Sequence, residues 1–361
     1  MRLIVEIGHP AHVHHFKNMI RILESKGHEI KIAASDKDVT KNLLNTYGFE
    51  YLKLGKNYKS LLGKACRLIL AKIKLLAYVK KVEPDLFISR ASPISAQVSK
   101  LTAKPHIAFC DTEISALSDF LSLPLTDAVC TPTSFKKNFG KKHIRYNGYT
   151  ELSYLHPKYF KPDPSILDFL NLNKGDKFII LRFVSWKAHH DIGHSGIDVQ
   201  TRKKLIEKIE KYARVLITSE STLSKRFEKY RISIPPHKIH DVLYYATMYI
   251  GEGATMATEA ALLGTPSIFV SPFARMLGNF EELERRYGLV YAFTDPSKAL
   301  EKAISLIQDD NTKLIWKRKR KKLLKDKIDV TKWMIEFIEN FPESFRDAKE
   351  NPEYWKRYKC S

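Results

Sequence analysis

Short apolar segments alternate with segments of helical periodicity along most of this chain, and this alternation strongly limits the folds that the chain can adopt. Residues 3–7 form the first apolar segment, residues 16–23 repeat apolar side chains at helical spacing, and residues 30–34 form the next apolar segment. A helical crossover between two buried segments is the connection that parallel β-strands require. The alternation continues to about residue 148 and starts again at residue 178. We therefore expect an α/β protein with two Rossmann-like, doubly wound domains, each built on a buried parallel sheet.

The length of 361 residues also supports two domains, because a single hydrophobic core rarely serves so long a chain. We assign residues 1–148 to the first Rossmann-like domain and residues 177–310 to the second. Residues 149–176 interrupt the alternation with three prolines, and we interpret them as the interdomain connection. Residues 311–361 are predicted to be helices that pack back across the lobes. Two facing domains of this kind would leave a cleft at the carboxyl ends of both sheets, where ligands bind in open α/β folds.

The segment GEGATMATEAALLGTP, at residues 251–266, is the sharpest local signal. Its two early glycines allow a tight turn after a strand, and the free N–H groups of the helix that follows could hold a pyrophosphate. Glu259 lies one helical turn after Thr255, so its carboxylate could accept hydrogen bonds from both hydroxyls of a ribose. The alternative is that the turn only connects a strand to a helix and that Glu259 is a solvated helix residue. The residues assigned to the pyrophosphate are Gly253, Ala254, Thr255 and Met256.

Two further loops of the second domain carry side chains that suit an anionic ligand. Arg182 and Lys187 follow its first strand, and a cation beside a departing diphosphate would neutralise the charge that develops there. Ser219 and Ser221 follow the next strand and offer hydroxyls, although they equally suit the N-cap of the following helix. His190 and His194 stand four residues apart and could ligate a metal on a helix, but the glycines around them favour a loop.

Four histidines crowd the loop after the first strand of the chain: His9, His12, His14 and His15. A neutral imidazole can act as a general base toward an acceptor hydroxyl, because its ordinary pKa lies near working pH. We choose His12 for this role. The alternatives are a zinc or iron site made by the clustered imidazoles and a purely structural cluster. We expect neither a metal nor a cofactor.

Asp111 and Glu113 follow another strand of the first domain. Two carboxylates at the edge of a sheet suit acid and base catalysis, and their pKa values would be pushed apart if they lay close together. The alternative is that Asp111 or Thr112 caps the helix that follows.

The motif G-A-x-x-x-x-E-A at residues 253–260, followed by L-G-T-P, resembles the nucleotide-diphosphate motif of GT-B glycosyltransferases and UDP-N-acetylglucosamine 2-epimerases. The segments AHVHHF and KGHEI near the amino terminus are similar to the opening of the peptidoglycan N-acetylglucosaminyltransferase. The layout most resembles the family called domain of unknown function 354, over most of the chain. The resemblance implies a GT-B fold, with Glu259 at a ribose, residues 253–256 at a diphosphate and residues 240–243 beside the base. His12 matches the loop histidine of those transferases, but Pro10 and Ala11 replace the glycines that precede it there.

Positive charge dominates the composition, with 61 Lys and Arg against 40 Asp and Glu, and this balance favours anionic partners. Residues 52–82 hold nine of these cations and no acid, interleaved with leucines and isoleucines. Such a segment could lie on an anionic membrane, or it could be a crossover helix with a solvated lysine face. The four cysteines form no C-x-x-C pair, and no apolar run reaches the length of a membrane span. We expect a cytoplasmic protein, with peripheral attachment at the inner face of the membrane.

We predict a glycosyltransferase that moves a sugar from a nucleotide diphosphate donor, with UDP as the expected nucleotide, to a glycan or lipid-phosphate acceptor. The first domain would bind the acceptor and the second the donor. The first alternative is a UDP-N-acetylglucosamine 2-epimerase that uses Asp111 and Glu113. The second is a non-catalytic binder of polyanions or nucleic acid, although the sequence contains no recognised nucleic-acid module.

Overall fold

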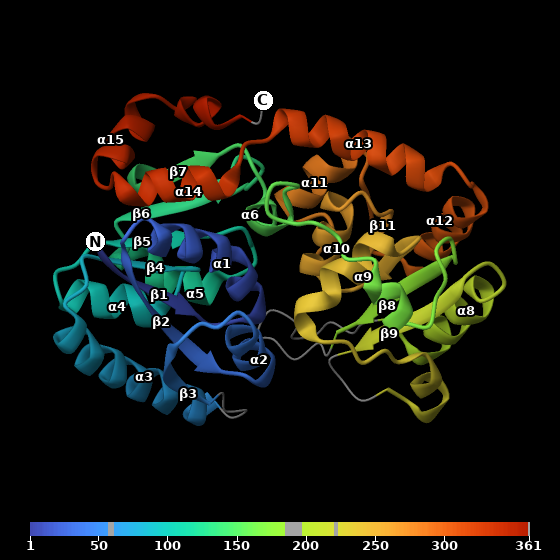
Figure 1. Ribbon diagram of the computed structural model, residues 1–361, viewed down its shortest axis with the longest axis horizontal. Coiled ribbons are helices and arrows are strands. Elements are labelled where there is room, and N and C mark those ends of the chain that lie inside the picture. The colour runs from blue at the N-terminus through green and yellow to red at the C-terminus, as the bar shows by residue number, and fades with distance from the viewer. Residues whose placement is uncertain (57–60, 185–196, 220–222, 360–361) are drawn as a thin grey trace. The chain divides into compact units, whose positions relative to one another are not determined.

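The computed structural model describes residues 1–56, 61–184, 197–219 and 223–359, and it divides the chain into two compact units (Figure 1). The first unit comprises Met1–Tyr159 and Lys327–Ser361, and the second comprises Phe160–Asp326. Each unit is built on one parallel sheet with helical crossovers, so the predicted pair of doubly wound α/β domains is confirmed. In the described part of the chain, no helix is both long and apolar enough to cross a membrane.

The first unit has a seven-stranded sheet in the order β3-β2-β1-β4-β5-β6-β7. Its strands are β1 (Arg2–Ile7), β2 (Glu29–Asp36), β3 (Tyr51–Lys56), β4 (Leu86–Ser89), β5 (His106–Phe109), β6 (Ala128–Pro132) and β7 (His143–Tyr146). Its α-helices are α1 (Pro10–Ser25), α2 (Asp38–Thr46), α3 (Leu61–Val82), α4 (Pro93–Leu101), α5 (Ala116–Ser122), α6 (Leu152–Leu155), α14 (Val330–Glu339) and α15 (Glu343–Glu350). Sequence analysis does not predict β7, an edge strand whose polar His143 and Arg145 alternate with apolar residues.

The second unit has a five-stranded sheet in the order β12-β11-β10-β8-β9. Its strands are β8 (Phe178–Phe183), β9 (Arg214–Ser219), β10 (Met248–Gly251), β11 (Ser267–Val270) and β12 (Val290–Phe293). Its α-helices are α7 (Ser165–Phe169), α8 (Val199–Ile209), α9 (Ile239–Tyr245), α10 (Ala254–Leu262), α11 (Gly278–Arg285), α12 (Pro296–Gln308) and α13 (Thr312–Asp326). Strand β12 was not predicted from the sequence, and the helix expected after Ser219 and Ser221 is a 3-10 helix at Lys225–Tyr230.

The boundaries of the units differ from those expected from the sequence. Tyr149, Leu152 and Leu155 are fully buried in the first unit, so the start of the expected connection at 149–176 belongs to that unit. The helices expected over residues 311–361 are divided between the units, with α13 in the second and α14 in the first.

The break between α13 and α14 has a cause in the backbone hydrogen bonds of the first unit. Ile328 donates its N–H to the carbonyl oxygen of Asn147 at 3.1 Å, and Asp329 donates its N–H to the carbonyl oxygen of Tyr358 at 3.0 Å. In a continuous helix these two N–H groups would instead donate to carbonyls one turn earlier in the same helix. Partners that lie far away in the sequence therefore end the regular helix here.

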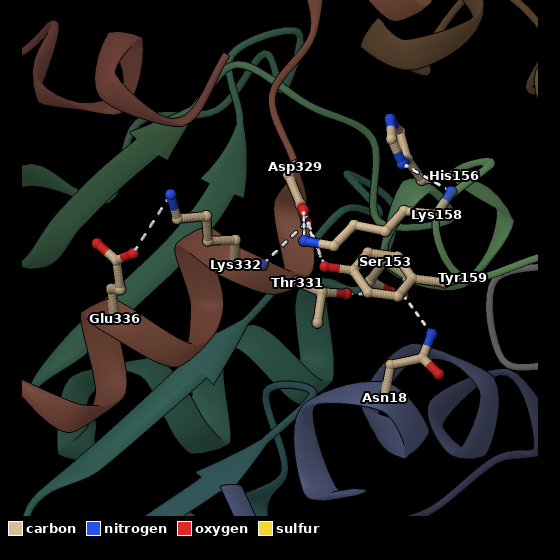
Figure 2. Close-up of polar contacts among 9 residues, drawn as sticks. All are labelled: Asn18, Ser153, His156, Lys158, Tyr159, Asp329, Thr331, Lys332 and Glu336. Carbon is tan, nitrogen blue, oxygen red and sulfur yellow. Dashed lines mark hydrogen bonds and ion pairs between the residues drawn. The ribbon is translucent and has the colours of Figure 1, made fainter. Parts of the chain in front are cut away.

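Asp329 begins α14 and joins it to the segment around α6 (Figure 2). Its carboxylate accepts hydrogen bonds from the backbone N–H of Lys332 at 2.9 Å, from the Tyr159 hydroxyl at 2.8 Å and from Lys158 Nζ at 3.0 Å. In the same view, Thr331 Oγ1 donates to the carbonyl of Ser153 at 2.7 Å. Asp329 thus caps α14 and also binds Lys158 and Tyr159. These contacts explain why this carboxy-terminal helix packs on the first unit.

Lys313 holds α13 against the rest of the second unit, and we predict that its loss destabilises that unit. Its Nζ donates to the carbonyl oxygens of Tyr244 and Ala246 at 2.8 and 2.5 Å and to Thr265 Oγ1 at 2.7 Å. A methionine would leave these acceptors without their donor, so Lys313→Met should lower the free energy of unfolding in urea by about 2–3 kcal/mol. Lys317→Met, at an exposed position one turn later, is the matched control. Equal stability of the two variants would contradict this prediction.

The same lysine predicts a dependence of stability on pH. Burial lowers the pKa of Lys313 to about 7, below the value of about 10.4 expected in the unfolded chain. Between these values the unfolded state binds more protons than the folded state, so stability from this group rises as pH rises. The difference in unfolding free energy between the wild type and Lys313→Met should therefore be larger at pH 9 than at pH 7.

Candidate functional site

The strand order of the second unit puts its topological switch point at the carboxyl ends of β8 and β10. The chain leaves β8 to form β9 on one side, and it returns to form β10 on the other. Crossovers that diverge in this way leave a crevice between the two adjacent strands, which is where open α/β sheets bind ligands. Gly251, the last residue of β10, pairs in register with Arg182 of β8. The glycine-rich turn and the predicted cation therefore lie next to each other at this point of the sheet.

The turn after β10 requires glycine because other groups approach its backbone closely. A Cβ atom at Gly251 would lie 2.6 Å from the Tyr249 hydroxyl and 2.8 Å from the carbonyl oxygen of Arg182, closer than real Cβ atoms come. The Tyr249 hydroxyl donates to the carbonyl of Gly253 at 3.1 Å, and burial raises the pKa of this phenol far above its ordinary value. Tyr249 therefore stays protonated, and its hydroxyl continues to donate a hydrogen bond that fixes the turn.

The first turn of α10 is accessible, whereas the rest of the helix is buried. Gly253 is the N-cap, and as a glycine it has no side chain that could cap this helix end. Thr255 is exposed, and burial becomes continuous from Ala257 onward. Backbone N–H groups at the start of such a helix suit a phosphate group, and the residues that present them are Gly253, Ala254, Thr255 and Met256. The predicted helix start is thus present, and its role in binding a diphosphate stays a prediction.

Glu259 is buried, with 4% of its surface exposed, so it is not the solvated helix residue of the alternative interpretation. Its Oε1 lies 3.0 Å from Nε2 of His240, which is itself buried in the first turn of α9. A buried carboxylate needs such a partner, because an isolated charge in the interior is costly. The pair brings together the predicted ribose ligand and the segment expected beside the base. Sequence analysis did not assign His240 this contact.

Glu252, a residue that was not predicted from the sequence, bonds to the backbone at two positions between β8 and α8. Its buried carboxylate accepts hydrogen bonds from the backbone N–H groups of Val184, at 3.1 Å, and of Ile197. Its own N–H donates to the carbonyl of Arg182 at 3.1 Å. Glu252 therefore fixes the two positions that flank residues 185–196. The available signal was its place between the two glycines of the turn.

Of the other residues predicted for this site, the structure describes Ser219 but not Lys187 or Ser221. Ser219 ends β9 and pairs in register with Phe183, the last residue of β8. It therefore lies at the same edge of the sheet as the glycine turn. Lys187, Ser221 and the proposed metal pair of His190 and His194 lie outside the residues that the structure describes.

His12, the predicted base, occupies the first turn of α1 in the first unit and lines a pocket of about 240 Å³. Burial, and next the nearby Arg90 cation, lower the pKa of His12 well below its ordinary value, so the ring is neutral at pH 7. Its Nδ1 accepts a hydrogen bond from the backbone N–H of Gly8 at 3.3 Å. A neutral ring in this arrangement carries its proton on Nε2, so proton abstraction by His12 requires that bond to Gly8 to break.

The four histidines of this region do not converge on one point. His9 is exposed and its ring accepts from the backbone N–H of Ala11, whereas the buried rings of His14 and His15 pack against Tyr154 and Phe16. Across the residues that the structure describes, no group of three His, Cys, Asp or Glu side chains is placed to hold a metal ion. The arrangement gives no support to the metal-site alternative within that part of the chain.

Asp111 and Glu113, the predicted acid and base pair, face different partners. Asp111 forms an ion pair with Arg90, and Arg90 also lies 3.2 Å from Nδ1 of His15. Glu113 accepts a hydrogen bond from the backbone N–H of Lys136 at 3.2 Å. Arg90, which links the acidic loop to His15 on α1, was not predicted from the sequence.

The alternative role of the acidic loop, as the cap of the following helix, is wrong. Helix α5 begins at Ala116, and its N-cap residue is Ser115 rather than Asp111 or Thr112. The Thr112 hydroxyl instead donates to the Asp111 carboxylate at 3.0 Å. The loop is therefore longer than the capping interpretation requires, and Asp111 is available to pair with Arg90.

Helix α3 forms most of the basic segment at residues 52–82, and it is both a crossover helix with a buried face and a helix with exposed apolar side chains. It buries Ala71, Leu75 and Val79 in a core cluster of the first unit. Its opposite face exposes apolar side chains as well as lysines, including Leu70 at 56% and Ile73 at 57%. A purely solvated lysine face is therefore not what this helix presents.

Comparison with known proteins identifies both the family and the fold. A family model described as "Protein of unknown function (DUF354)" matches residues 1–343. The uncharacterized protein MJ0665 of Methanocaldococcus jannaschii is 25% identical over 281 residues, which cover 74% of this chain and 81% of that protein.

Solved structures of two kinds of enzyme have a similar fold. The UDP-GlcNAc 2-epimerase from Neisseria meningitidis, solved bound to UDP-GlcNAc, matches with a TM-score of 0.68 and 13% identity, covering 94% of this chain and 99% of that chain. The glycosyltransferase SsfS6 from Streptomyces sp. SF2575 matches with a TM-score of 0.61 and 11% identity, covering 94% of this chain and 100% of that chain. At these identities the likeness establishes the GT-B fold, and the match of the family model over nearly the whole length shows that this chain belongs to the DUF354 family.

Proposed function

We propose that the protein is a glycosyltransferase that moves a sugar from a nucleotide diphosphate donor, with UDP as the nucleotide, to a glycan or lipid-phosphate acceptor. The observation that carries this proposal is the conjunction, at the switch point of the second sheet, of the glycine turn, the open start of α10 and the buried Glu259. A helix start suits the diphosphate, and a carboxylate one turn later suits the ribose hydroxyls. The similar folds of a glycosyltransferase and of an epimerase that was solved bound to UDP-GlcNAc support the same assignment.

The residues would divide the work between binding and charge neutralisation. The N–H groups at the start of α10 would hold the diphosphate, and Arg182 would neutralise the charge that develops on it as the sugar leaves. Glu259 would orient the ribose while His240 keeps its carboxylate in place. His12 would take the proton of the acceptor hydroxyl once its Nδ1 bond to Gly8 is released.

The exposed apolar and basic face of α3 supports a peripheral contact with the inner face of a membrane. Apolar side chains such as Leu70 and Ile73 can enter the lipid boundary, while neighbouring lysines attract anionic headgroups. This contact would bring the enzyme to a lipid-linked acceptor.

A UDP-N-acetylglucosamine 2-epimerase is the second candidate, favoured by the TM-score of 0.68 to such an enzyme. Incubation of the protein with UDP-N-acetylglucosamine alone distinguishes the two reactions. A transferase should leave the sugar nucleotide intact until a lipid phosphate or glycan is added, and then release UDP together with a glycosylated acceptor. Release of an epimerised sugar in the absence of an acceptor would contradict the transferase proposal and support the epimerase. Chromatography of the nucleotide and sugar products provides the measurement.

A further inference from the structure

The pocket that His12 lines in the first unit lies at the switch point of that unit's sheet. Strand β1 lies between β2 and β4, so the crossovers diverge here as they do at β8 in the second unit. The pocket of about 240 Å³ is lined by residues that directly follow β1 and β4, among them Gly8, Arg90 and Ser92. Apart from His12, sequence analysis assigns none of its lining residues to a ligand.

The charges that line this pocket are mostly positive. Lys37, Arg67 and Arg90 provide three cations, and Glu6 is the carboxylate among the lining residues. Arg90 is already paired with Asp111. Glu6 is buried and accepts from Ser95 Oγ at 2.9 Å, and burial raises the pKa of its carboxyl although the nearby Arg67 cation opposes this shift. The pocket therefore favours an anion over a neutral or cationic ligand.

Arg67 has unused capacity to donate hydrogen bonds. Its Nη2 donates to Ser35 Oγ at 2.6 Å, while its Nε is buried and has no hydrogen-bond partner among the residues that the structure describes. Buried N–H groups in proteins are nearly always paired, and a guanidinium pairs best with a planar or tetrahedral oxyanion. A phosphate oxygen beside Arg67 would supply the missing acceptor.

Apolar side chains adjoin the cations of the pocket. Leu68 and Ile94 contribute to the lining, and Ser118 of the lining stands beside Leu117 on α5. Leu117 is 59% exposed, and Phe120 on the same helix is 76% exposed. A ligand with a phosphate group at one end and an apolar body fits this distribution of side chains better than a uniformly polar ligand does.

We propose that this pocket binds a phosphate group of the acceptor substrate. Lys37 and Arg67 would hold this phosphate beside His12. This inference extends the proposed function, because it assigns a binding pocket to the anionic group of the acceptor. It rests on the proposed function only in treating the bound molecule as the acceptor of the transfer reaction. Phosphate binding itself is measurable without any turnover.

Calorimetric titration of the full-length protein with inorganic phosphate and with hexyl phosphate tests this inference, in chloride buffer with UDP present in excess. Lys37→Met and Arg67→Met should each weaken phosphate binding at least fivefold. Lys41→Met is the matched control, because Lys41 is exposed one turn after Lys37 at the start of α2 and is not part of the pocket lining. Lys37→Met also serves as the second variant should Arg67→Met fail to fold. Binding that is equal in the wild type and both pocket variants would overturn the proposal.

The two ligands distinguish the source of the phosphate. Tighter binding of hexyl phosphate than of inorganic phosphate supports a phosphate carried by a lipid, and equal affinity supports a water-soluble phosphate, both within the proposed pocket. UDP titration of the same variants separates this inference from the proposed function. Loss of phosphate binding with UDP affinity retained supports both, whereas a wild type that binds phosphate through Lys37 but does not bind UDP refutes the nucleotide assignment alone.

Discussion

Replacement of Glu259 by alanine is expected to weaken the binding of UDP about a hundredfold, which corresponds to about 2.7 kcal/mol. The variant removes the carboxylate proposed to accept hydrogen bonds from both ribose hydroxyls, and each hydrogen bond to a charged group contributes about 1.5–3 kcal/mol. Calorimetric titration of the wild type and Glu259→Ala with UDP provides the measurement. Glu207→Ala, at an exposed glutamate on α8 of the same unit, is the matched control and should leave the affinity unchanged.

Because Glu259 is also paired with His240, a loss of binding must be separated from a loss of structure. Glu259→Gln keeps the shape of the side chain and can still contact the imidazole, so its thermal unfolding should remain close to that of the wild type. A folded Glu259→Gln with UDP affinity reduced at least tenfold supports a direct role of the carboxylate charge. Unchanged UDP binding in a folded Glu259→Ala would remove the ribose assignment and the strongest support for the proposed function.

Replacement of Gly251 by alanine should lower the free energy of unfolding by about 3 kcal/mol or more. The new methyl group would lie within 2.8 Å of the Tyr249 hydroxyl, the Arg182 Cβ and the Arg182 carbonyl oxygen, and two of these atoms belong to a strand that cannot shift independently of its sheet. Urea unfolding followed by circular dichroism measures this change.

Gly253→Ala is the matched control in the same turn. Its Cβ would meet the Arg182 Cγ and the Tyr249 hydroxyl at 3.4 Å, an ordinary contact, and its φ of −87° suits any residue. We expect it to change the unfolding free energy by less than about 1 kcal/mol. Similar stabilities of the two alanine variants would show that the close approach at Gly251 does not constrain the turn.

The sequence allowed most of the buried strands to be predicted, because strands such as β1 and β8 are short, continuous apolar runs bounded by turns. It did not allow β7 and β12 to be predicted, since both are four-residue edge strands that are not buried along their whole length. The break after α13 was missed for a different reason. It depends on the acceptors that Asn147 and Tyr358 offer to the backbone, and these are far away in the chain.

The candidate site shows the same division. Local spacing was enough to predict the glycine turn and the helix that begins at Ala254, because both depend on neighbouring residues. The pairing of Glu259 with His240, the contacts of Glu252 and the pairing of Asp111 with Arg90 join residues that are 19 to 68 positions apart in the chain. Hydrophobic periodicity contains no information about such pairs.

The order of apolar and polar residues by itself determined that this chain forms two parallel α/β sheets, because burial on both faces of a strand and on one face of a helix leaves a readable pattern. Only the tertiary structure decided which polar side chains share a buried environment. Arg67 and Lys37 beside His12, and Glu259 beside His240, meet because crossovers bring distant loops to the same edge of a sheet. The physical reason is that strand order, rather than sequence distance, sets which loops become neighbours.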